Sequence, residues 1–132
     1  MPRRAIRTLI VDDNPDFLRV ACEWLDGEVG VAVVGTAESG SSAIRAVHEL
    51  GPELVLMDVA MPGMDGIEAT RRIKELPNPP SVVLVTLYDT SAIRASALDA
   101  GADAVFSKRE FGESIEAILR TLGDESGTPC SA

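Results

Sequence analysis

Short runs of apolar residues alternate along this chain with longer stretches in which apolar residues recur every three or four positions. Nearly unbroken short runs are typical of strands buried on both faces, as in a parallel sheet, whereas the longer stretches have the period of amphipathic helices. The pattern predicts strands over residues 5–11, 30–36, 53–57, 82–86 and 103–107, and helices over 15–27, 40–50, 65–76, 90–100 and 110–122.

Residues at the predicted boundaries agree with this division. Pro15 suits a first helical turn, Ser39, Ser41 and Ser42 are candidate caps, and Gly101 is a natural helix stop. Regular alternation of strand and helix predicts parallel strands joined by right-handed crossovers, which is a doubly wound α/β fold. We expect one domain over residues 1–122, and residues 123–132 as a flexible tail or linker stump.

Four of the predicted strands end at polar residues with related chemistry. Asp12 and Asp13 follow the first strand, Asp58 follows the third, Thr86 ends the fourth and Lys108 follows the fifth. In an open parallel sheet, ligands bind outside the carboxyl ends of the strands. The pattern therefore predicts that three acids, a hydroxyl and an ammonium meet at one edge of the sheet.

These residue types together suit a divalent cation and a phosphoryl group. Two carboxylates ~4 Å apart repel by about 4 kcal/mol at an effective dielectric near 20, so a cation or a proton must relieve the cluster. Oxygen ligands without His or Cys favour Mg²⁺. A carboxylate can also attack phosphorus to form an acyl phosphate, with Lys108 and Thr86 binding the phosphoryl oxygens.

Each residue alone has a simpler interpretation. Asp12 or Asp13 would serve equally well as the N-cap of the helix at Pro15, and Asp58 as a loop acid. A single Thr or Lys at a strand end usually has no special role. The joint arrangement of all of them at strand ends favours a site.

Composition narrows the function further. The formal net charge of -9 disfavours direct binding to nucleic acid and favours cations and basic partner surfaces. Cys22 and Cys130 do not form a disulfide framework. The apolar run after the basic N-terminus is too short for a signal peptide, and no stretch reaches the roughly 18 apolar residues of a membrane span. We expect a soluble, cytoplasmic protein without membrane contact.

Longer motifs resemble one known family. They are LIVDDNP at 9–15, LVLMDVAMPGMDGIE at 54–68, VVLVT at 82–86 and GADAVFSK at 101–108. In this order and spacing the chain resembles a bacterial two-component response-regulator receiver domain, the CheY-like family. The resemblance implies a flavodoxin-like (βα)5 fold, with a five-stranded parallel sheet in the order 2-1-3-4-5 and helices on both faces.

The resemblance also implies a role for each site residue. Asp58 would be the phosphoacceptor, Asp12 and Asp13 would bind Mg²⁺ together with Asp58 and the backbone carbonyl of Ala60, and Thr86 and Lys108 would bind the phosphoryl group. The donor would be a sensor histidine kinase or a histidine phosphotransfer protein. Phosphorylation would switch a protein-interaction surface on the fourth helix, fifth strand and fifth helix, and would allow a phosphorylation-dependent homodimer.

Some positions depart from the family pattern. Val105 stands where an aromatic residue usually changes rotamer on activation, and strand alternation turns Phe106 to the opposite face. Leu87 replaces the usual small residue after Thr86, and Arg109 replaces the frequent proline after the lysine. The chain's histidine, His48, lies on a predicted helix far from the strand ends and is expected at the surface.

Other functions remain open at this stage. A true aspartyl-nucleophile phosphatase normally has a second acid two residues after the nucleophile, where this chain has Ala60, so we do not expect an enzyme with turnover. A degenerate receiver that acts only in docking or dimerisation is kept open by Val105 and Leu87. The chain also resembles receivers attached to DNA-binding domains, so it would serve as a single-domain regulator or as the receiver half of a longer one.

Overall fold

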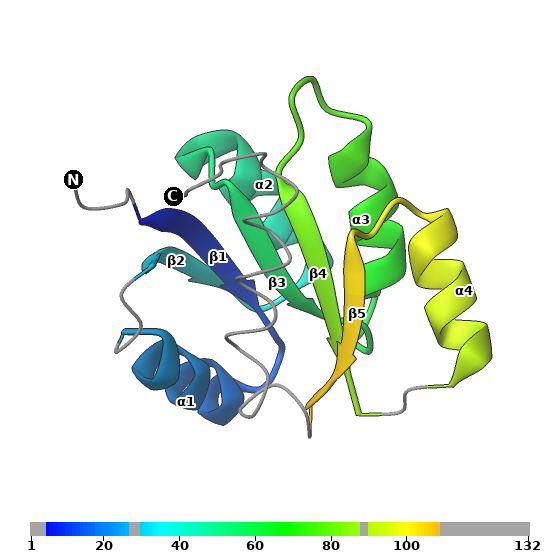
Figure 1. The fold of residues 1–132 in the computed structure, drawn as a ribbon, viewed down its shortest axis with the longest axis horizontal. Coiled ribbons are helices and arrows are strands. Elements are labelled where there is room, and N and C mark those ends of the chain that lie inside the picture. Colours follow the sequence, from blue (N-terminus) through cyan, green and yellow to red (C-terminus); the bar gives the residue numbers. More distant parts are fainter. Residues whose placement is uncertain (1–4, 27–29, 88–89, 109–132) are drawn as a thin grey trace, which may run out of the picture.

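The computed structural model describes residues 5–26, 30–87 and 90–108. Strands and helices alternate throughout these residues (Figure 1). The strands are β1 (Ile6–Val11), β2 (Val31–Ala37), β3 (Leu54–Asp58), β4 (Ser81–Thr86) and β5 (Ala104–Ser107). The helices are α1 (Pro15–Asp26), α2 (Gly40–Leu50), α3 (Gly66–Lys74) and α4 (Ser91–Asp99).

The predicted fold is confirmed within these residues, with boundaries that differ from the prediction by no more than a few positions. The strands form a single parallel sheet in the order β2-β1-β3-β4-β5. The predicted helix over 110–122 and the predicted tail over 123–132 lie outside the described residues, and so does Arg109. None of the described helices combines the length and apolar character needed to cross a membrane.

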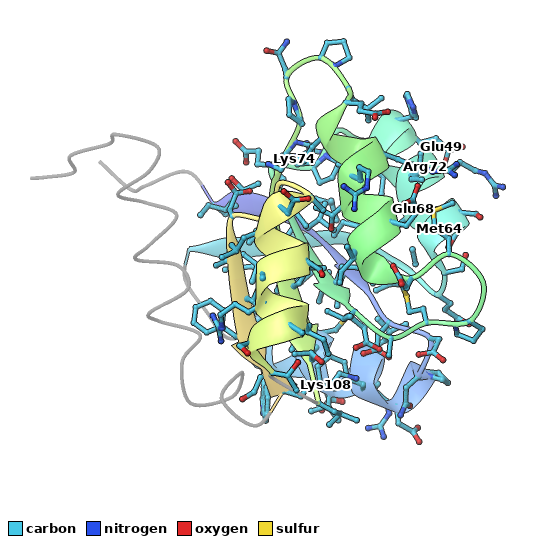
Figure 2. The ribbon with its side chains drawn as sticks, turned by 90° about the vertical axis from the view of Figure 1, so that its right-hand side faces the viewer. Glu49, Met64, Glu68, Arg72, Lys74 and Lys108 are labelled. Carbon is cyan, nitrogen blue, oxygen red and sulfur yellow. The ribbon has the colours of Figure 1, made fainter. Side chains whose placement is uncertain are left out.

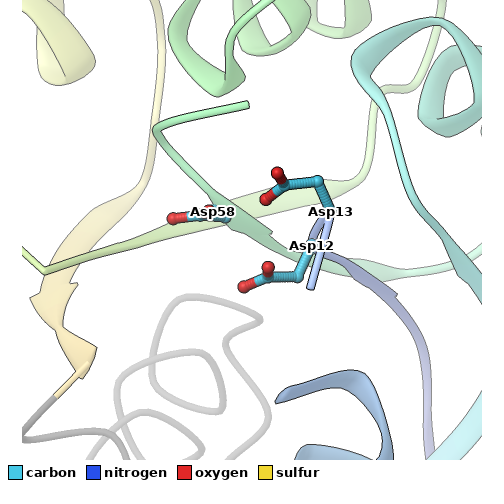
Figure 3. A group of neighbouring side chains, drawn as sticks. All are labelled: Asp12, Asp13 and Asp58. Atoms are coloured by element: carbon cyan, nitrogen blue, oxygen red, sulfur yellow. The ribbon is translucent and has the colours of Figure 1, made fainter. Parts of the chain in front are cut away.

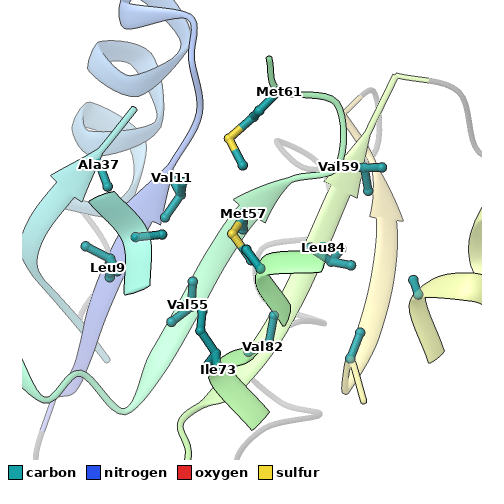
Figure 4. Close-up of a cluster of buried hydrophobic side chains, with 14 of the residues drawn as sticks. Leu9, Val11, Ala37, Val55, Met57, Val59, Met61, Ile73, Val82 and Leu84 are labelled. Atoms are coloured by element: carbon teal, nitrogen blue, oxygen red, sulfur yellow. The ribbon is translucent and has the colours of Figure 1, made fainter. Parts of the chain in front are cut away.

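The sheet has an apolar layer on each face. Helix α1 covers one face, and α2, α3 and α4 cover the other (Figure 1). The larger apolar cluster lies under α2, α3 and α4 and is built on alternate residues of the central strands, such as Leu9, Val55 and Leu84 (Figure 4). The intervening residues, such as Ile10 and Leu56, pack against α1. Burial on both faces explains why these strands read as unbroken apolar runs.

Local hydrogen bonds set the ends of the helices. Ser39 and Ser42 form a reciprocal capping box at the start of α2, which confirms the expected serine cap, and Gly51 ends that helix with φ 57°. The Arg7 guanidinium donates a 2.7 Å hydrogen bond to the Leu50 carbonyl at the same end. A cation there satisfies carbonyls that lack helical partners and complements the negative end of the helix dipole.

A glycine controls how the chain turns from β3 into α3. A Cβ atom built on Gly66 would lie 2.1 Å from the backbone oxygen of Asp58. The Gly66 amide donates a 2.8 Å hydrogen bond to the carbonyl of Val59, which closes the loop on itself. The start of α2 packs just as tightly on this loop, because a Cβ atom on Gly40 would lie 2.8 Å from the Met64 carbonyl oxygen. The N-terminus of α3 therefore packs on the end of β3, and the N-terminus of α2 packs on the loop that follows it.

Candidate functional site

The strand register brings the predicted acids together. Val11 pairs with Met57, so Asp12 and Asp58 follow side by side at the carboxyl ends of β1 and β3. Figure 3 shows the side chains of Asp12, Asp13 and Asp58 converging on one small volume. One carboxylate oxygen from each of the three residues lies within 4.8 Å of those of the other two. The prediction that these acids converge is confirmed.

Asp12 is the most deeply buried member, with 0% of its surface exposed. Its Oδ1 atom accepts a 2.8 Å hydrogen bond from the backbone amide of Asn14. Its Oδ2 atom lies 2.8 Å from the Lys108 ammonium as an ion pair, but it accepts no hydrogen bond of normal geometry from any described residue. A buried carboxylate oxygen in this state still has the capacity to accept a hydrogen bond or to bind a cation.

The simpler interpretation of Asp12 and Asp13 as helix caps is wrong for α1. Asn14 caps this helix, because its side-chain oxygen accepts hydrogen bonds from the amides of Asp16, at 2.9 Å, and Phe17, at 3.3 Å. This role of Asn14 was not predicted from the sequence, although Asn immediately before Pro at a helix start is a favourable signal for it. Capping by Asn14 leaves the carboxylates of Asp12 and Asp13 directed at the sheet edge.

Burial and neighbouring charge act strongly on Asp58. The pKa of Asp58 is raised to about 6, first by burial and then by the negative charge of Asp12. Lys108 and a hydrogen bond from the Ala60 backbone amide act in the opposite direction. The carboxylate is thus held in a place where its charge is incompletely neutralised, which is the usual environment of a group that awaits a cation or a reaction partner.

Lys108 reaches the same cluster from the end of β5. Its Nζ atom lies 2.8 Å from Asp12 Oδ2 and 3.7 Å from Asp58 Oδ2, and its side chain is 13% exposed. The ring of Phe17, at the start of α1, lies 4.4 Å from this ammonium, measured to the ring centroid. Phe17 was not predicted from the sequence as part of the site, since an apolar residue in a first helical turn ordinarily indicates only packing.

Thr86 is buried at the end of β4, with 2% of its surface exposed. It lies next to Ser107 in the sheet register, and its neighbour Val85 pairs with Asp58. The register therefore brings Thr86 to the same edge of the sheet as the acids and Lys108. Ala60 is exposed in the β3–α3 loop, two residues beyond Asp58.

The donor set fits a small, hard cation. The three clustered side chains offer carboxylate oxygens only, and Asp12 Oδ2 is buried without a hydrogen bond from the described residues. Mg²⁺ prefers a few carboxylate oxygens and keeps several waters, and the exposed Asp13 leaves the site open to solvent. The cluster can therefore accept Mg²⁺ at the carboxyl end of the sheet.

The charge of Asp58 gives a prediction about stability. An acid whose pKa is raised on folding binds its proton more tightly in the folded state, so its protonation stabilises the fold at low pH, and this contribution is lost as the pH rises through about 6. We expect Asp58→Asn to raise the free energy of unfolding by about 1–2 kcal/mol near neutral pH without divalent cations. This increase in the free energy of unfolding should disappear at about pH 4, where the wild-type carboxyl of Asp58 is protonated.

Urea denaturation of both proteins across this pH range, in the presence of a chelator, measures the difference. Asp65→Asn is a suitable control, because Asp65 caps α3 through a hydrogen bond to the Glu68 amide and lies outside the acid cluster. An Asp58→Asn variant that is less stable than the wild type near neutral pH would contradict the prediction.

Val105, which departs from the family pattern, and its neighbour Phe106 lie on opposite faces of β5, as expected. Val105 is 4% exposed and belongs to the cluster under α3 and α4, whereas Phe106 packs with the cluster under α1. Leu87 is 68% exposed at the end of β4, and Tyr88 lies outside the described residues. His48 is exposed on α2, which confirms its expected surface position.

Comparisons with known proteins agree with this geometry. The profile of the response regulator receiver domain matches residues 8–120. The response regulator protein VraR of Staphylococcus saprophyticus is 41% identical over 126 residues, which cover 92% of this chain and 58% of that protein. A protein-glutamate methylesterase of Methanospirillum hungatei is 40% identical over 105 residues, which cover 78% of this chain and 30% of that protein.

Solved structures show the same fold. The receiver domain of the putative response regulator NarL from Mycobacterium tuberculosis superposes with a TM-score of 0.85 at 30% identity, and the match covers 92% of this chain and 99% of that one. The chain spans little more than half of VraR and less than a third of the methylesterase. The chain therefore belongs to the receiver domains of two-component response regulators.

Proposed function

We propose that Asp58 accepts a phosphoryl group in a Mg²⁺-dependent reaction and that this event switches a protein-interaction surface. The observation that carries the proposal is the cluster at the sheet edge, in which Asp58 lies close to two other acids and to the Lys108 ammonium. The raised pKa of Asp58 supports the same conclusion, because burial and the charge of Asp12 disfavour an ionised carboxylate that a bound cation would stabilise.

The chain's own residues account for most of the transfer. A carboxylate oxygen of Asp58 attacks phosphorus, a new oxygen–phosphorus bond forms, and the bond from phosphorus to the donor breaks. A phosphohistidine donor leaves as neutral imidazole after it takes up a proton, and an acetyl phosphate donor leaves as acetate. Lys108 stabilises the phosphoryl oxygens as a point charge, and the Thr86 hydroxyl donates a hydrogen bond to another of them.

Asp12, Asp13 and Asp58 would hold Mg²⁺, with the Ala60 backbone carbonyl as the remaining protein ligand. When bound, the metal neutralises charge on the carboxylates and on the phosphoryl oxygens. The oxygen-only donor set and the buried Asp12 Oδ2 support this assignment. Asn14 and Gly66 contribute indirectly, because one fixes the direction of Asp12 and the other fixes the path of the chain after Asp58.

The switch would act through the end of β4 and through α4. Phosphorylation adds roughly one and a half to two negative charges near Thr86 and Lys108. Helix α4 has one buried residue, Ala97, and the Arg94 guanidinium ties it to β5 by a 3.1 Å hydrogen bond to the Val105 carbonyl. A helix with so small a buried stripe can shift at modest cost when the preceding loop moves.

Phosphoryl donors of the histidine kinase or phosphotransfer type fit the family, and a downstream protein or an output domain would read the switched surface. VraR is named a response regulator, and the chain covers 58% of it, which supports a role as the receiver part of such a regulator. We propose that this domain does not turn over other substrates and does not contact nucleic acid or membrane directly. A phosphorylation-dependent homodimer is one proposed route of output. We also propose a cytoplasmic location.

Acetyl phosphate tests the central step. We expect the purified protein to gain the mass of one phosphoryl group when incubated with Mg²⁺ and acetyl phosphate, because the cluster supplies both nucleophile and counter-charge. Asp58→Asn should abolish the adduct, and a chelator should prevent it. Asp103→Asn, at the other end of the sheet, serves as a control that removes one partly buried, ion-paired carboxylate without touching the cluster.

No adduct in the wild type, with Mg²⁺ binding confirmed and a phosphorylated histidine kinase also failing as donor, would favour the degenerate docking module. An adduct that survives Asp58→Asn would place the phosphoryl group elsewhere. If no adduct forms, Val105 and Leu87 would be the first positions to revert to the family pattern.

A further inference from the structure

We propose that Phe17 is a positioning residue for Lys108, and that the face of its ring holds the ammonium where the phosphoryl group of the proposed reaction must arrive. This inference rests on the proposed phosphoryl transfer to Asp58. The observation behind it is the distance of 4.4 Å between Lys108 Nζ and the centroid of the Phe17 ring. Ammonium ions within about 6 Å of a ring centroid are attracted by the electron density of the ring face.

Lys108 needs such a contact because its side chain is long and its ammonium lies closer to Asp12 than to Asp58. The Nζ atom lies 2.8 Å from Asp12 Oδ2 but 3.7 Å from Asp58 Oδ2, so the nucleophile receives the weaker interaction. The four-carbon side chain of Lys108 extends from the end of β5, and it loses rotational freedom when it is confined. A ring that already confines the stem reduces the freedom that remains to be lost when the phosphoryl oxygens bind.

An aromatic ring performs this task without the drawbacks of another carboxylate. A further acid beside Lys108 would add to the negative charge that already raises the pKa of Asp58. The ring of Phe17 carries no net charge, so it attracts the ammonium and leaves the carboxylate cluster unchanged. It also forms no strong hydrogen bond, and the ammonium keeps donors for a phosphoryl oxygen.

The position of Phe17 in the fold suits this role. Its amide is bound by the Asn14 side chain at the start of α1, so the residue is fixed within a few positions of Asp12 and Asp13. Phe17 also lines a small cavity with Asp58, Met57 and Val85, and it packs against the apolar cluster under α1. Packing alone would explain a large apolar residue here, and the experiment must separate packing from attraction of the ammonium.

Site-specific fluorination of the Phe17 ring makes this separation. Each added fluorine withdraws electron density from the ring face while the ring keeps nearly the same size. We expect the rate of phosphoryl transfer from acetyl phosphate, followed by intact mass in the presence of Mg²⁺, to fall stepwise with one, two and three fluorines. The total fall should be about fivefold, which corresponds to about 1 kcal/mol of lost interaction.

Two controls make the result specific. The same fluorinated series in a Lys108→Met background should leave the residual rate unchanged, because the ammonium is absent. Fluorination of Phe106, which packs with the same apolar cluster, should also leave the rate unchanged. The side-chain protons next to Lys108 Nζ should show an upfield ring-current shift in the NMR spectrum of the wild type, and Phe17→Leu should remove it.

The outcomes are distinguishable. A wild type that binds Mg²⁺ but forms no adduct from either acetyl phosphate or a phosphorylated histidine kinase overturns the proposed function and this inference with it. A wild type that forms the adduct at a rate insensitive to fluorination leaves the proposed function intact and shows that Phe17 serves packing alone. An equal slope in the Lys108→Met background would likewise overturn the inference.

Discussion

Gly66→Ala is expected to lower the free energy of unfolding by about 3 kcal/mol, which is at the upper end of what overpacking usually costs. The added Cβ atom would lie 2.1 Å from the Asp58 backbone oxygen and 3.0 Å from the Val59 Cα atom. Both of these atoms belong to the main chain, so no side-chain rotation can relieve the contact. The start of α3 must move away from the end of β3, and the hydrogen bond from the Gly66 amide to the Val59 carbonyl must lengthen.

Urea denaturation of the variant and the wild type measures this difference, and Gly30→Ala is the matched control. A Cβ atom on Gly30 would meet no heavy atom within 4 Å, and its backbone requires no positive φ. We expect the control to change stability by less than about 0.5 kcal/mol. Because the added Cβ atom would clash with the main chain of Asp58, Gly66→Ala should also disturb the position of this residue and weaken Mg²⁺ binding. A variant as stable as Gly30→Ala would show that the β3–α3 loop adapts more freely than its packing indicates.

The fold was predictable because sequence period and burial agree in this domain. Central strands such as β3 are buried on both faces, so they appear as unbroken apolar runs, and the helices carry the longer period. Boundaries were less accurate where helix ends depend on tertiary contacts. The predicted helix over 65–76 begins one residue later, because the side chain of Asp65 serves as its N-cap, and it ends at Lys74.

The acids of the site were predictable because parallel strands place their carboxyl ends at one edge, so that the order of residues along the chain becomes proximity in space. The supporting residues were not. Phe17 and Asn14 are not residue types that indicate a phosphoryl or metal site. Their roles depend on where α1 begins relative to β1. Gly66 lies in a recognisable motif, but only the structure shows that it contacts the Asp58 carbonyl.

Lys108→Met is expected to have the second large effect, with a loss of about 3 kcal/mol of stability near neutral pH without Mg²⁺. Asp12 is 0% exposed, and Lys108 is its ion-pair partner at 2.8 Å. Methionine conserves most of the volume of the lysine stem but removes the charge, so the buried carboxylates of Asp12 and Asp58 would face one another without the ammonium. Adding Asp12→Asn to Lys108→Met should restore part of the lost stability, because the most buried charge is then removed.

Mg²⁺ provides the sharper measurement, since a cation that binds the acids can replace the missing ammonium. We expect millimolar Mg²⁺ to return most of the stability of Lys108→Met in urea denaturation, because a ligand that binds only the folded state stabilises it by mass action. Lys74→Met is the matched control, since Lys74 forms a 2.8 Å ion pair with Asp103 at the opposite end of the sheet (Figure 2). The difference in free energy of unfolding between Lys74→Met and the wild type should be the same with and without Mg²⁺. If Mg²⁺ restored the stability of both variants equally, Lys108 would not be the counter-charge of the acid cluster. A different positively charged group would then have to neutralise the acids.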